Sequence, residues 1–166
     1  MKTAFIKIYT NTSSKEVNLS RGDIAKEYFF KGFNCSQAVA LAFSDLLDVD
    51  PDSLSKMCIG FGGGLARQRL TCGAVSGMTF VLGALLSDGK DKGYIYSIVQ
   101  SACADFKNEV GSLVCGDLLE GKIKFDGSPS PDERTTEYYK KRPCPDLCKL
   151  AGDITEKYLK EYGIIK

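Results

Sequence analysis

The segment Thr71-Cys72-Gly73-Ala74-Val75-Ser76-Gly77 opens an apolar run that continues to Leu86. Just before it lie residues 60–64, with the sequence GFGGG, whose glycines allow positive φ angles and close approach of other backbone. Thr71 is the expected N-cap of a helix, which places Cys72 in the first helical turn. Unpaired N–H groups and the positive end of the helix dipole favour a thiolate there. Cys72 is therefore the first candidate for chemistry.

Gly73 and Gly77 lie four residues apart and leave one face of this helix almost without side chains, so another element can pack closely against it. The large apolar residues that follow predict that this helix lies in the core. Apolar residues also recur at helical spacing in other segments, namely 20–32, 34–47, 50–61, 94–110 and 144–159. The expected fold is all-α, an irregular bundle of about six helices around the central glycine-containing helix.

The chain of 166 residues has the size of one domain and is long enough to bury a core. Residues 1–19 are expected to form an N-terminal arm, in which residues 4–10 are rich in aromatic and β-branched side chains and indicate a short strand. Residues 20–166 are expected to form a single helical domain. The predicted N-caps of its first three helices are Ser20, Asn34 and Asp50.

The charge balance argues against two classes of partner. With 22 basic and 21 acidic residues the net charge is +1, so neither nucleic acid nor an anionic membrane surface is expected. The longest apolar run, residues 74–86, is too short to span a bilayer, and residues 1–13 lack the apolar core and cleavage site of a signal peptide. A cytoplasmic protein without membrane insertion is expected, and a homo-oligomer is compatible with the composition.

Seven cysteines and the absence of histidine narrow the chemistry. An odd number of cysteines argues against a fully paired secreted framework, so metal binding or redox chemistry is the better expectation. Without histidine there is no Ser-His-Asp triad, no Cys-His pair, no mixed Cys/His zinc site and no histidine-ligated haem. Any metal must be held by thiolates, with carboxylates as the other available ligands.

The cysteines fall into groups according to their surroundings. Cys58 and Cys103 lie on apolar helical stripes, so both are expected in the core. Cys148 lies one turn after Cys144, the expected N-cap of the last helix, and either approaches it or packs with its apolar neighbours. The remaining cysteines are predicted at helix starts or in a glycine-flanked turn, where a lowered thiol pKa and an accessible sulfur are expected; they are Cys35, Cys72, Cys115 and Cys144.

Two arginines, Arg67 and Arg69, lie between the glycine-rich loop and Cys72. Their guanidinium groups are candidates for holding an anion or for stabilising a thiolate. Solvated surface arginines are the alternative interpretation.

Several segments together resemble the C_GCAxxG_C_C family of redox-active proteins. The resemblance covers about residues 20–162 and is carried by Asn34-Cys35-Ser36-Gln37-Ala38-Val39, the glycine loop 60–64, Cys72-Gly73-Ala74-Val75-Ser76-Gly77, Gly111-Ser112-Leu113-Val114-Cys115 and Cys144-Pro145. That family is defined by four cysteines and a CGAxxG motif. The resemblance therefore implies a redox function that depends on Cys35, Cys72, Cys115 and Cys144.

The resemblance also bears on cofactors. A related domain occurs in cytochromes that carry haem and an iron–sulfur centre. This chain has no Cys-x-x-Cys-His site and no histidine, so haem is not expected, whereas an iron–sulfur centre stays open.

The sequence leaves three functions open. In the leading hypothesis the four matching cysteines form one cluster and cycle between thiol and disulfide, as in a thiol-based oxidoreductase, with Cys72 attacking and an unknown redox partner. In the alternative, the same four thiolates bind an iron–sulfur cluster or another metal and transfer electrons. In the third, the protein is a helical scaffold whose cysteines are buried and inert.

Overall fold

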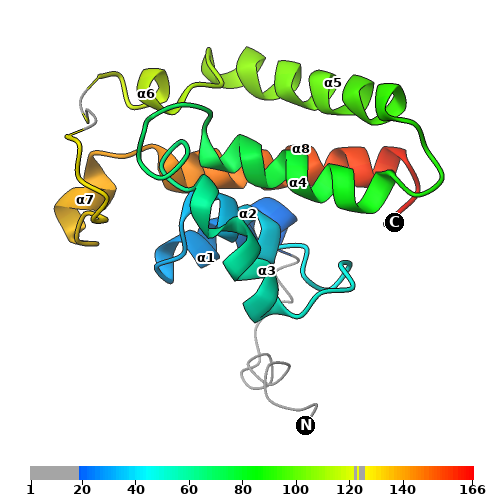
Figure 1. Cartoon of the computed structure of the whole chain (residues 1–166), viewed down its shortest axis with the longest axis horizontal. Helices are drawn as coiled ribbons and strands as arrows, with labels where there is room; N and C mark the ends of the chain where they lie inside the picture. Colours follow the sequence, from blue (N-terminus) through cyan, green and yellow to red (C-terminus); the bar gives the residue numbers. More distant parts are fainter. Residues whose placement is uncertain (1–18, 122, 124–125) are drawn as a thin grey trace, which may run out of the picture.

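The computed structural model describes residues 19–121, 123 and 126–166, and the expected strand at residues 4–10 lies outside them. Regular structure in the described part is helical apart from one isolated β-bridge, which confirms the predicted all-α class (Figure 1). The helices are α1 (Arg21–Phe30), α2 (Cys35–Leu41), α3 (Pro51–Cys58), the 3₁₀ helix η1 (Ile59–Phe61), α4 (Gly73–Leu86), α5 (Lys92–Val110), α6 (Cys115–Leu118), α7 (Thr136–Lys140) and α8 (Cys144–Glu161).

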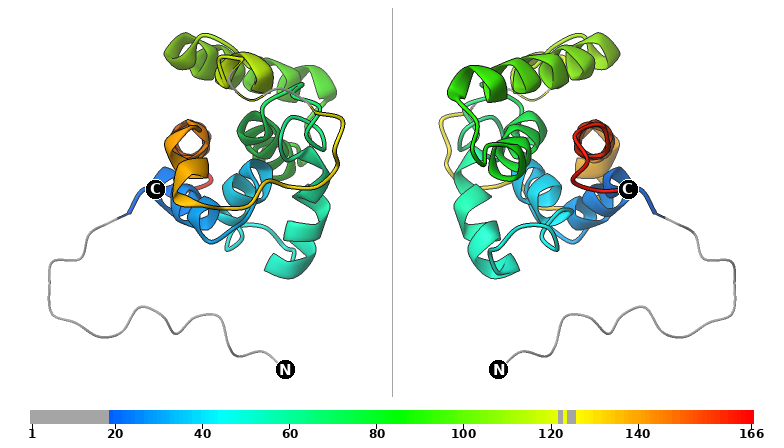
Figure 2. Two further views of the ribbon diagram at one scale, coloured as in Figure 1. Left: turned by 90° about the vertical axis from the view of Figure 1, so that its left-hand side faces the viewer. Right: turned by 90° about the vertical axis from the view of Figure 1, so that its right-hand side faces the viewer.

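The helices are stacked in three levels. In Figures 1 and 2, α4 and α8 occupy the middle, α5 covers them on one side, and α1, α2 and α3 lie on the other. The helix α4 packs against α2, α5 and α8, as expected for a central helix, and α8 packs against the same levels from its own side. Two short helices, α6 and α7, add to the six that were expected.

Short polar side chains fix the starts of the first three helices. Ser20 accepts a hydrogen bond from the backbone N–H of Asp23 at 3.1 Å, and Asn34 accepts two from the first turn of α2. Asp50 caps α3 and is followed by a proline, whose fixed φ suits the first helical position. These three predicted caps are confirmed, and each such cap contributes about 1 kcal/mol to helix stability.

The start of α4 differs from the expectation. Thr71 forms an isolated antiparallel β-bridge with Val114, so its backbone is engaged across the fold and it is not the N-cap. Cys72 is itself the N-cap residue, so α4 begins one position later than expected. The last helix is shifted the other way, because Pro143, not Cys144, is the N-cap of α8 and Cys144 is its first residue.

The helix α2 is shorter than expected and ends at Leu41. Arg21 explains the end, because its guanidinium donates to the carbonyl oxygen of Ala42 at 2.8 Å and also pairs with Asp45. This side chain from α1 therefore satisfies a carbonyl that lacks a helical partner. The chain then turns through residues 42–49 before α3 begins.

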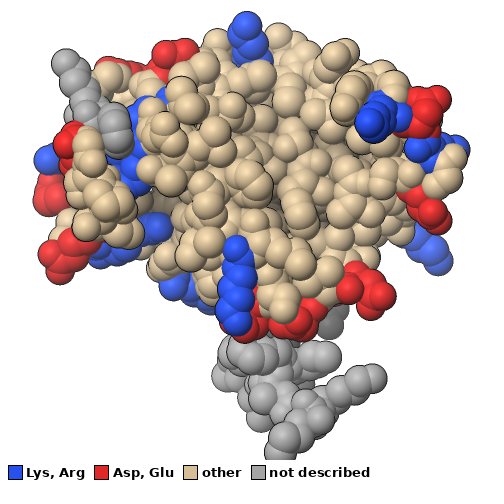
Figure 3. All heavy atoms as spheres, in the orientation of Figure 1, with Lys and Arg blue, Asp and Glu red and all other residues tan. Residues whose placement is uncertain are grey.

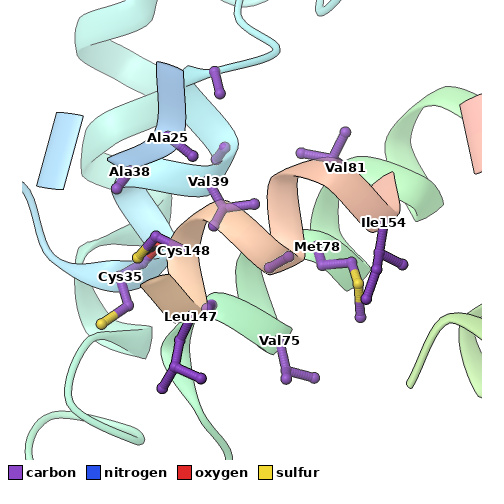
Figure 4. Close-up of a cluster of buried hydrophobic side chains, with 14 of the residues drawn as sticks. Ala25, Cys35, Ala38, Val39, Val75, Met78, Val81, Leu147, Cys148 and Ile154 are labelled. Carbon is purple, nitrogen blue, oxygen red and sulfur yellow. Dashed lines mark hydrogen bonds between the residues drawn. The ribbon is translucent and has the colours of Figure 1, made fainter. Parts of the chain in front are cut away.

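The core is formed where the levels meet. Figure 4 shows Val75, Met78 and Val81 of α4 near Val39 of α2 and Ile154 of α8, and all five are buried. Full burial of a side chain of this size contributes about 1.5–3 kcal/mol.

The apolar stripe predicted on α3 is only partly buried. Leu54 and Cys58 are buried, whereas Met57 and Phe61 are exposed. Phe61 leaves the stripe because the chain tightens into η1 directly after Cys58. The change from α to 3₁₀ geometry alters the angle between successive side chains and breaks the stripe.

The surface seen in Figure 3 carries most of its charged side chains around its edge, and the middle is largely uncharged. In the part of the chain that the structure describes, no helix is both long enough and apolar enough to cross a bilayer.

Candidate functional site

The starts of α2 and α4 meet at two glycines. A Cβ atom added at Gly73 would lie 3.1 Å from the Cβ of Cys35, and one added at Gly77 would lie 2.8 Å from the carbonyl oxygen of Ser36. Neither space admits a side chain without movement of backbone. The close approach predicted for this face of α4 therefore occurs. It places Cys35 at the N-terminal end of α4, next to Cys72.

A second contact sets Cys72 beside Cys115. The N–H of Cys72 donates to the carbonyl of Leu113 at 2.8 Å, and the N–H of Cys115 donates to the carbonyl of Leu70 at 2.6 Å. These two bonds flank the bridge between Thr71 and its partner. In this antiparallel register the two cysteines are diagonal neighbours on the same face, an arrangement in which side chains can interact.

The start of α8 supplies the third part. The thiol of Cys35 interacts with the thiols of both Cys144 and Cys148, and each interaction shifts the pKa of the groups involved. The Sγ of Cys148 also lies 3.8 Å from the carbonyl oxygen of Cys35. Figure 4 shows Cys35 and Cys148 next to one another at the junction of α2 and α8. Cys148, whose role the sequence left undecided, is therefore in contact with a cysteine that matches the family.

The structure thus brings all four predicted site cysteines together and adds a fifth. The thiol cluster, as we call it, consists of Cys35, Cys72, Cys115, Cys144 and Cys148, whose members influence one another electrostatically. All seven cysteines lie in the described residues, and each is present there as a free thiol.

Two cysteines lie outside the thiol cluster. Cys58 is fully buried on α3, as predicted, while Cys103 on α5 is only half-buried. Burial raises the pKa of both thiols, with no contribution from another described thiol.

The pKa of Cys72 is opposite to the expectation. Burial raises it to about 12, although the backbone amides of Ala74 and Val75 lower it. The helix start therefore acts in the expected direction, but Cys72 is only 3 % exposed and desolvation of the thiolate dominates. The prediction of a readily ionised thiol at this position is wrong.

Cys115 has a different balance of forces. Burial and the nearby Cys144 raise the pKa of its thiol, while Arg69 and Arg142 lower it. For Cys144, a hydrogen bond with Cys35 and then burial raise the pKa strongly, and Arg142 opposes them. Cys115 is thus the cluster thiol on which two guanidinium groups act together.

A left-handed loop places Arg69 against Cys115. Leu65, Ala66, Arg67 and Arg69 all have positive φ, between 47° and 70°, a conformation that costs about 1–2 kcal/mol per non-glycine residue. Gly64 lies in the same loop, where an added Cβ would come within 2.7 Å of the Cβ of Cys115. The loop therefore approaches this cysteine as closely as backbone allows.

The two candidate arginines have different environments. Arg69 is 9 % exposed, its Nη1 lies 3.4 Å from the carbonyl of Gly63, and its Nε has no hydrogen-bond partner among the described residues. Arg67 instead pairs with Asp126 at 3.3 Å and Asp132 at 3.1 Å. Its charge is balanced by these carboxylates, so of the two arginines only Arg69 acts on a cluster thiol.

Three further side chains near the cluster were not predicted. Arg142 lies 4.4 Å from the ring centroid of Tyr138 and pairs with Asp132, and Arg134 lies 4.8 Å from the same ring. Burial raises the pKa of Tyr138 to about 12, and Cys144 and Cys35 add to the rise. The position of Arg142 two residues before Cys144 is the one sequence signal that pointed to this group.

A metal ion would need several cysteine or carboxylate ligands around one point. Within residues 19–121, 123 and 126–166, no group of three or more His, Cys, Asp or Glu side chains is placed to hold a metal ion. A tetrahedral thiolate site needs four sulfurs around one point, so the described thiols do not form such a site in this arrangement.

A comparison with family models finds one match. The family described as "Putative redox-active protein (C_GCAxxG_C_C)" matches residues 33–158, a range that contains the whole thiol cluster. No curated protein and no solved structure matches the chain.

Proposed function

Because this chain belongs to the C_GCAxxG_C_C family, we propose that it transfers electron pairs by thiol–disulfide exchange through Cys35, Cys72, Cys115 and Cys144. The observation that carries the proposal is the thiol cluster itself. Four free thiols from distant parts of the chain meet where α2, α4, α6 and α8 begin, near enough to shift one another's pKa values. Core packing alone gives no reason for cysteines to gather at helix starts.

Cys115 is the attacking thiol in this proposal, in place of Cys72. The thiolate is the nucleophile in disulfide exchange, so the residue that ionises most readily attacks first. Burial raises the pKa of both thiols, but Arg69 and Arg142 oppose the rise at Cys115, whereas backbone amides alone oppose it at Cys72.

The exchange proceeds in two balanced steps with an oxidised dithiol as partner. The Cys115 thiolate attacks one partner sulfur, an S–S bond forms between them, and the electron pair of the broken bond goes to the second partner sulfur, which takes up a proton. Cys72, the diagonal neighbour, then attacks Cys115 and releases the first partner sulfur, which receives the proton that Cys72 loses. The chain is oxidised by two electrons and the partner is reduced by two.

Neither alternative has comparable support. A metal or iron–sulfur centre needs several thiolates directed at one point, and the described cysteines lack that arrangement. An inert scaffold needs cysteines separated by apolar side chains, as Cys58 is, and five of the seven have thiol neighbours instead.

Redox titration tests the proposal. Reduced protein is equilibrated with mixtures of reduced and oxidised dithiothreitol, quenched with a thiol-blocking reagent, and analysed by peptide mass spectrometry. We expect Cys72 and Cys115 to lose their free thiols together, as one disulfide forms, while Cys58 and Cys103 stay reduced. The variant Cys115→Ser should be oxidised more slowly by oxidised dithiothreitol than the wild type. Cys103→Ser is the matched control.

Two results would contradict the proposal. Seven free thiols at every potential would favour the scaffold. A brown protein with stoichiometric iron after anaerobic purification would favour the iron–sulfur alternative.

A further inference from the structure

Cys35 has two thiol partners on one helix. Cys144 and Cys148 lie one turn apart on α8, and the thiol of each interacts with Cys35. Because a sulfur forms one disulfide at a time, Cys35 can be joined to either partner but not to both. The family motif includes Cys144 and not Cys148, so the second partner has no assigned role.

The two partners differ in burial. Cys144 is 7 % exposed at the start of α8, whereas Cys148 is fully buried one turn further along the helix. The thiol of Cys148 is directed at α2, as shown by its 3.8 Å contact with the carbonyl oxygen of Cys35. It is therefore not simply packed among the apolar residues of its own helix.

From this geometry we propose that Cys148 is a fifth redox thiol. It replaces Cys144 as the disulfide partner of Cys35 by thiol–disulfide exchange, and the disulfide thereby moves into the core. The inference rests on the proposed function, because it requires that the thiol cluster be oxidised.

The exchange is balanced without any further oxidant. The Cys148 thiolate attacks the Sγ of Cys35 in a disulfide between Cys35 and Cys144. The bond between Cys35 and Cys148 forms as the bond to Cys144 breaks, and the electron pair stays on the sulfur of Cys144. That sulfur takes up the proton that Cys148 loses, so the number of electrons in the protein is unchanged.

The direction of the exchange follows from the surroundings of the two products. A disulfide is uncharged and apolar, so it suits the fully buried site of Cys148, which external thiols cannot reach, better than the partly exposed start of α8. The thiol released at Cys144 returns to a position within electrostatic reach of Cys72, Cys115 and Arg142. The exchange therefore shields the disulfide from external thiols and makes Cys144 available to the outer part of the cluster.

Disulfide mapping over time tests the proposal. Reduced wild-type protein is mixed with oxidised glutathione, which supplies the two-electron oxidation, and samples are quenched with acid at intervals before digestion and mass spectrometry. We expect a Cys35–Cys144 disulfide early and a Cys35–Cys148 disulfide at equilibrium. In Cys148→Ser only the first should form, with an equilibrium constant at least tenfold smaller, which corresponds to a midpoint potential about 30 mV less negative.

Further variants separate the possible outcomes. Cys144→Ser should still reach the Cys35–Cys148 disulfide, and Cys58→Ser, which changes a buried cysteine outside the cluster, should leave the disulfide map unchanged. A Cys35–Cys144 disulfide that persists in the wild type, with the same potential in Cys148→Ser, would overturn this inference and leave the proposed function standing. No disulfide within the cluster in any variant would overturn both. The wild-type map decides the question even if one variant fails to fold.

Discussion

Gly77 on α4 lies directly against Ser36 on α2, with room for a hydrogen but not for a methyl group between them. Ser36 is itself fixed, because its hydroxyl donates to the carbonyl oxygen of Cys58 at 2.5 Å. The second glycine of the CGAxxG motif therefore has a packing role: it sets the distance between two helices whose starts carry Cys35 and Cys72.

Replacing Gly77 by Ala should lower the free energy of unfolding by about 1–3 kcal/mol, the usual cost of overpacking a tight contact. Gly83 lies on the same helix, and no described atom lies within 4 Å of a Cβ added there. Gly83→Ala is thus a matched control that should raise stability by up to about 1 kcal/mol, through helix propensity. Urea denaturation of both variants measures the difference, and equal effects would argue against the close contact.

Replacing Arg69 by Met should slow the alkylation of Cys115 about tenfold at neutral pH, because a nearby guanidinium group lowers a thiol pKa by about one unit or more. The rate is measured with iodoacetamide on reduced, native protein, with Cys115 identified by mass spectrometry. Arg67→Met is the control, since that side chain pairs with Asp126 and Asp132 instead. Equal rates in both variants would remove Arg69 from the site.

Cys72 should be poorly reactive in the native protein near neutral pH. Burial raises its pKa to about 12, so its thiolate fraction is small, whereas in the unfolded chain the pKa returns to an ordinary thiol value. Alkylation should therefore be slower at Cys72 than at Cys115 in buffer, and the difference should largely disappear in strong denaturant. Faster labelling of Cys72 in the native state would restore it as the attacking thiol.

The same shifts predict how stability depends on pH under reducing conditions. A thiol whose pKa is raised by folding stabilises the native state fully below its unfolded pKa, near 9, and this stabilisation is lost as the pH rises through the folded value. For Cys72 the window runs from about pH 9 to about pH 12, and the pKa values of the other cluster thiols are raised as well. Denaturation midpoints should be similar at pH 7 and 8 and fall from pH 9 to 10.5.

Replacing Ala66 by Gly should raise stability by about 1 kcal/mol, since glycine adopts a left-handed conformation without the penalty of a Cβ. Ala66 has φ of 47° and is exposed, so no packing is lost. Ala104, exposed in the middle of α5, is the control, because glycine there should destabilise by about 1 kcal/mol. A loss of stability in both variants would argue against the left-handed loop.

Local features of the fold could be predicted from the sequence, while contacts between distant segments could not. Ser20, Asn34 and Asp50 cap their helices because a short polar side chain binds amides two or three residues away. Thr71 has the same chemistry, but its backbone pairs with Val114, and no local pattern reveals that partner.

The site shows the same division. The grouping of Cys35, Cys72, Cys115 and Cys144 was expected from helix starts and from resemblance to the family. The pKa of Cys72 was predicted with the wrong sign, because the effect of the helix start is local while desolvation depends on everything that covers the sulfur. Cys148 stayed undecided because its partner, Cys35, is 113 residues away.

That separation gives the contact between Cys35 and Cys148 a consequence for the lifetime of the protein. A covalent bond there would close a loop of more than 100 residues, which in the chain-entropy model disfavours the unfolded state by about 4–5 kcal/mol. Proteases that act on the unfolded chain would then remove the reduced form much faster than the oxidised form. Digestion of both forms at equal protease concentration measures the effect, and equal half-lives would exclude it. Under changing redox conditions the oxidised molecules would then persist while the reduced molecules are degraded, without a separate sensor protein.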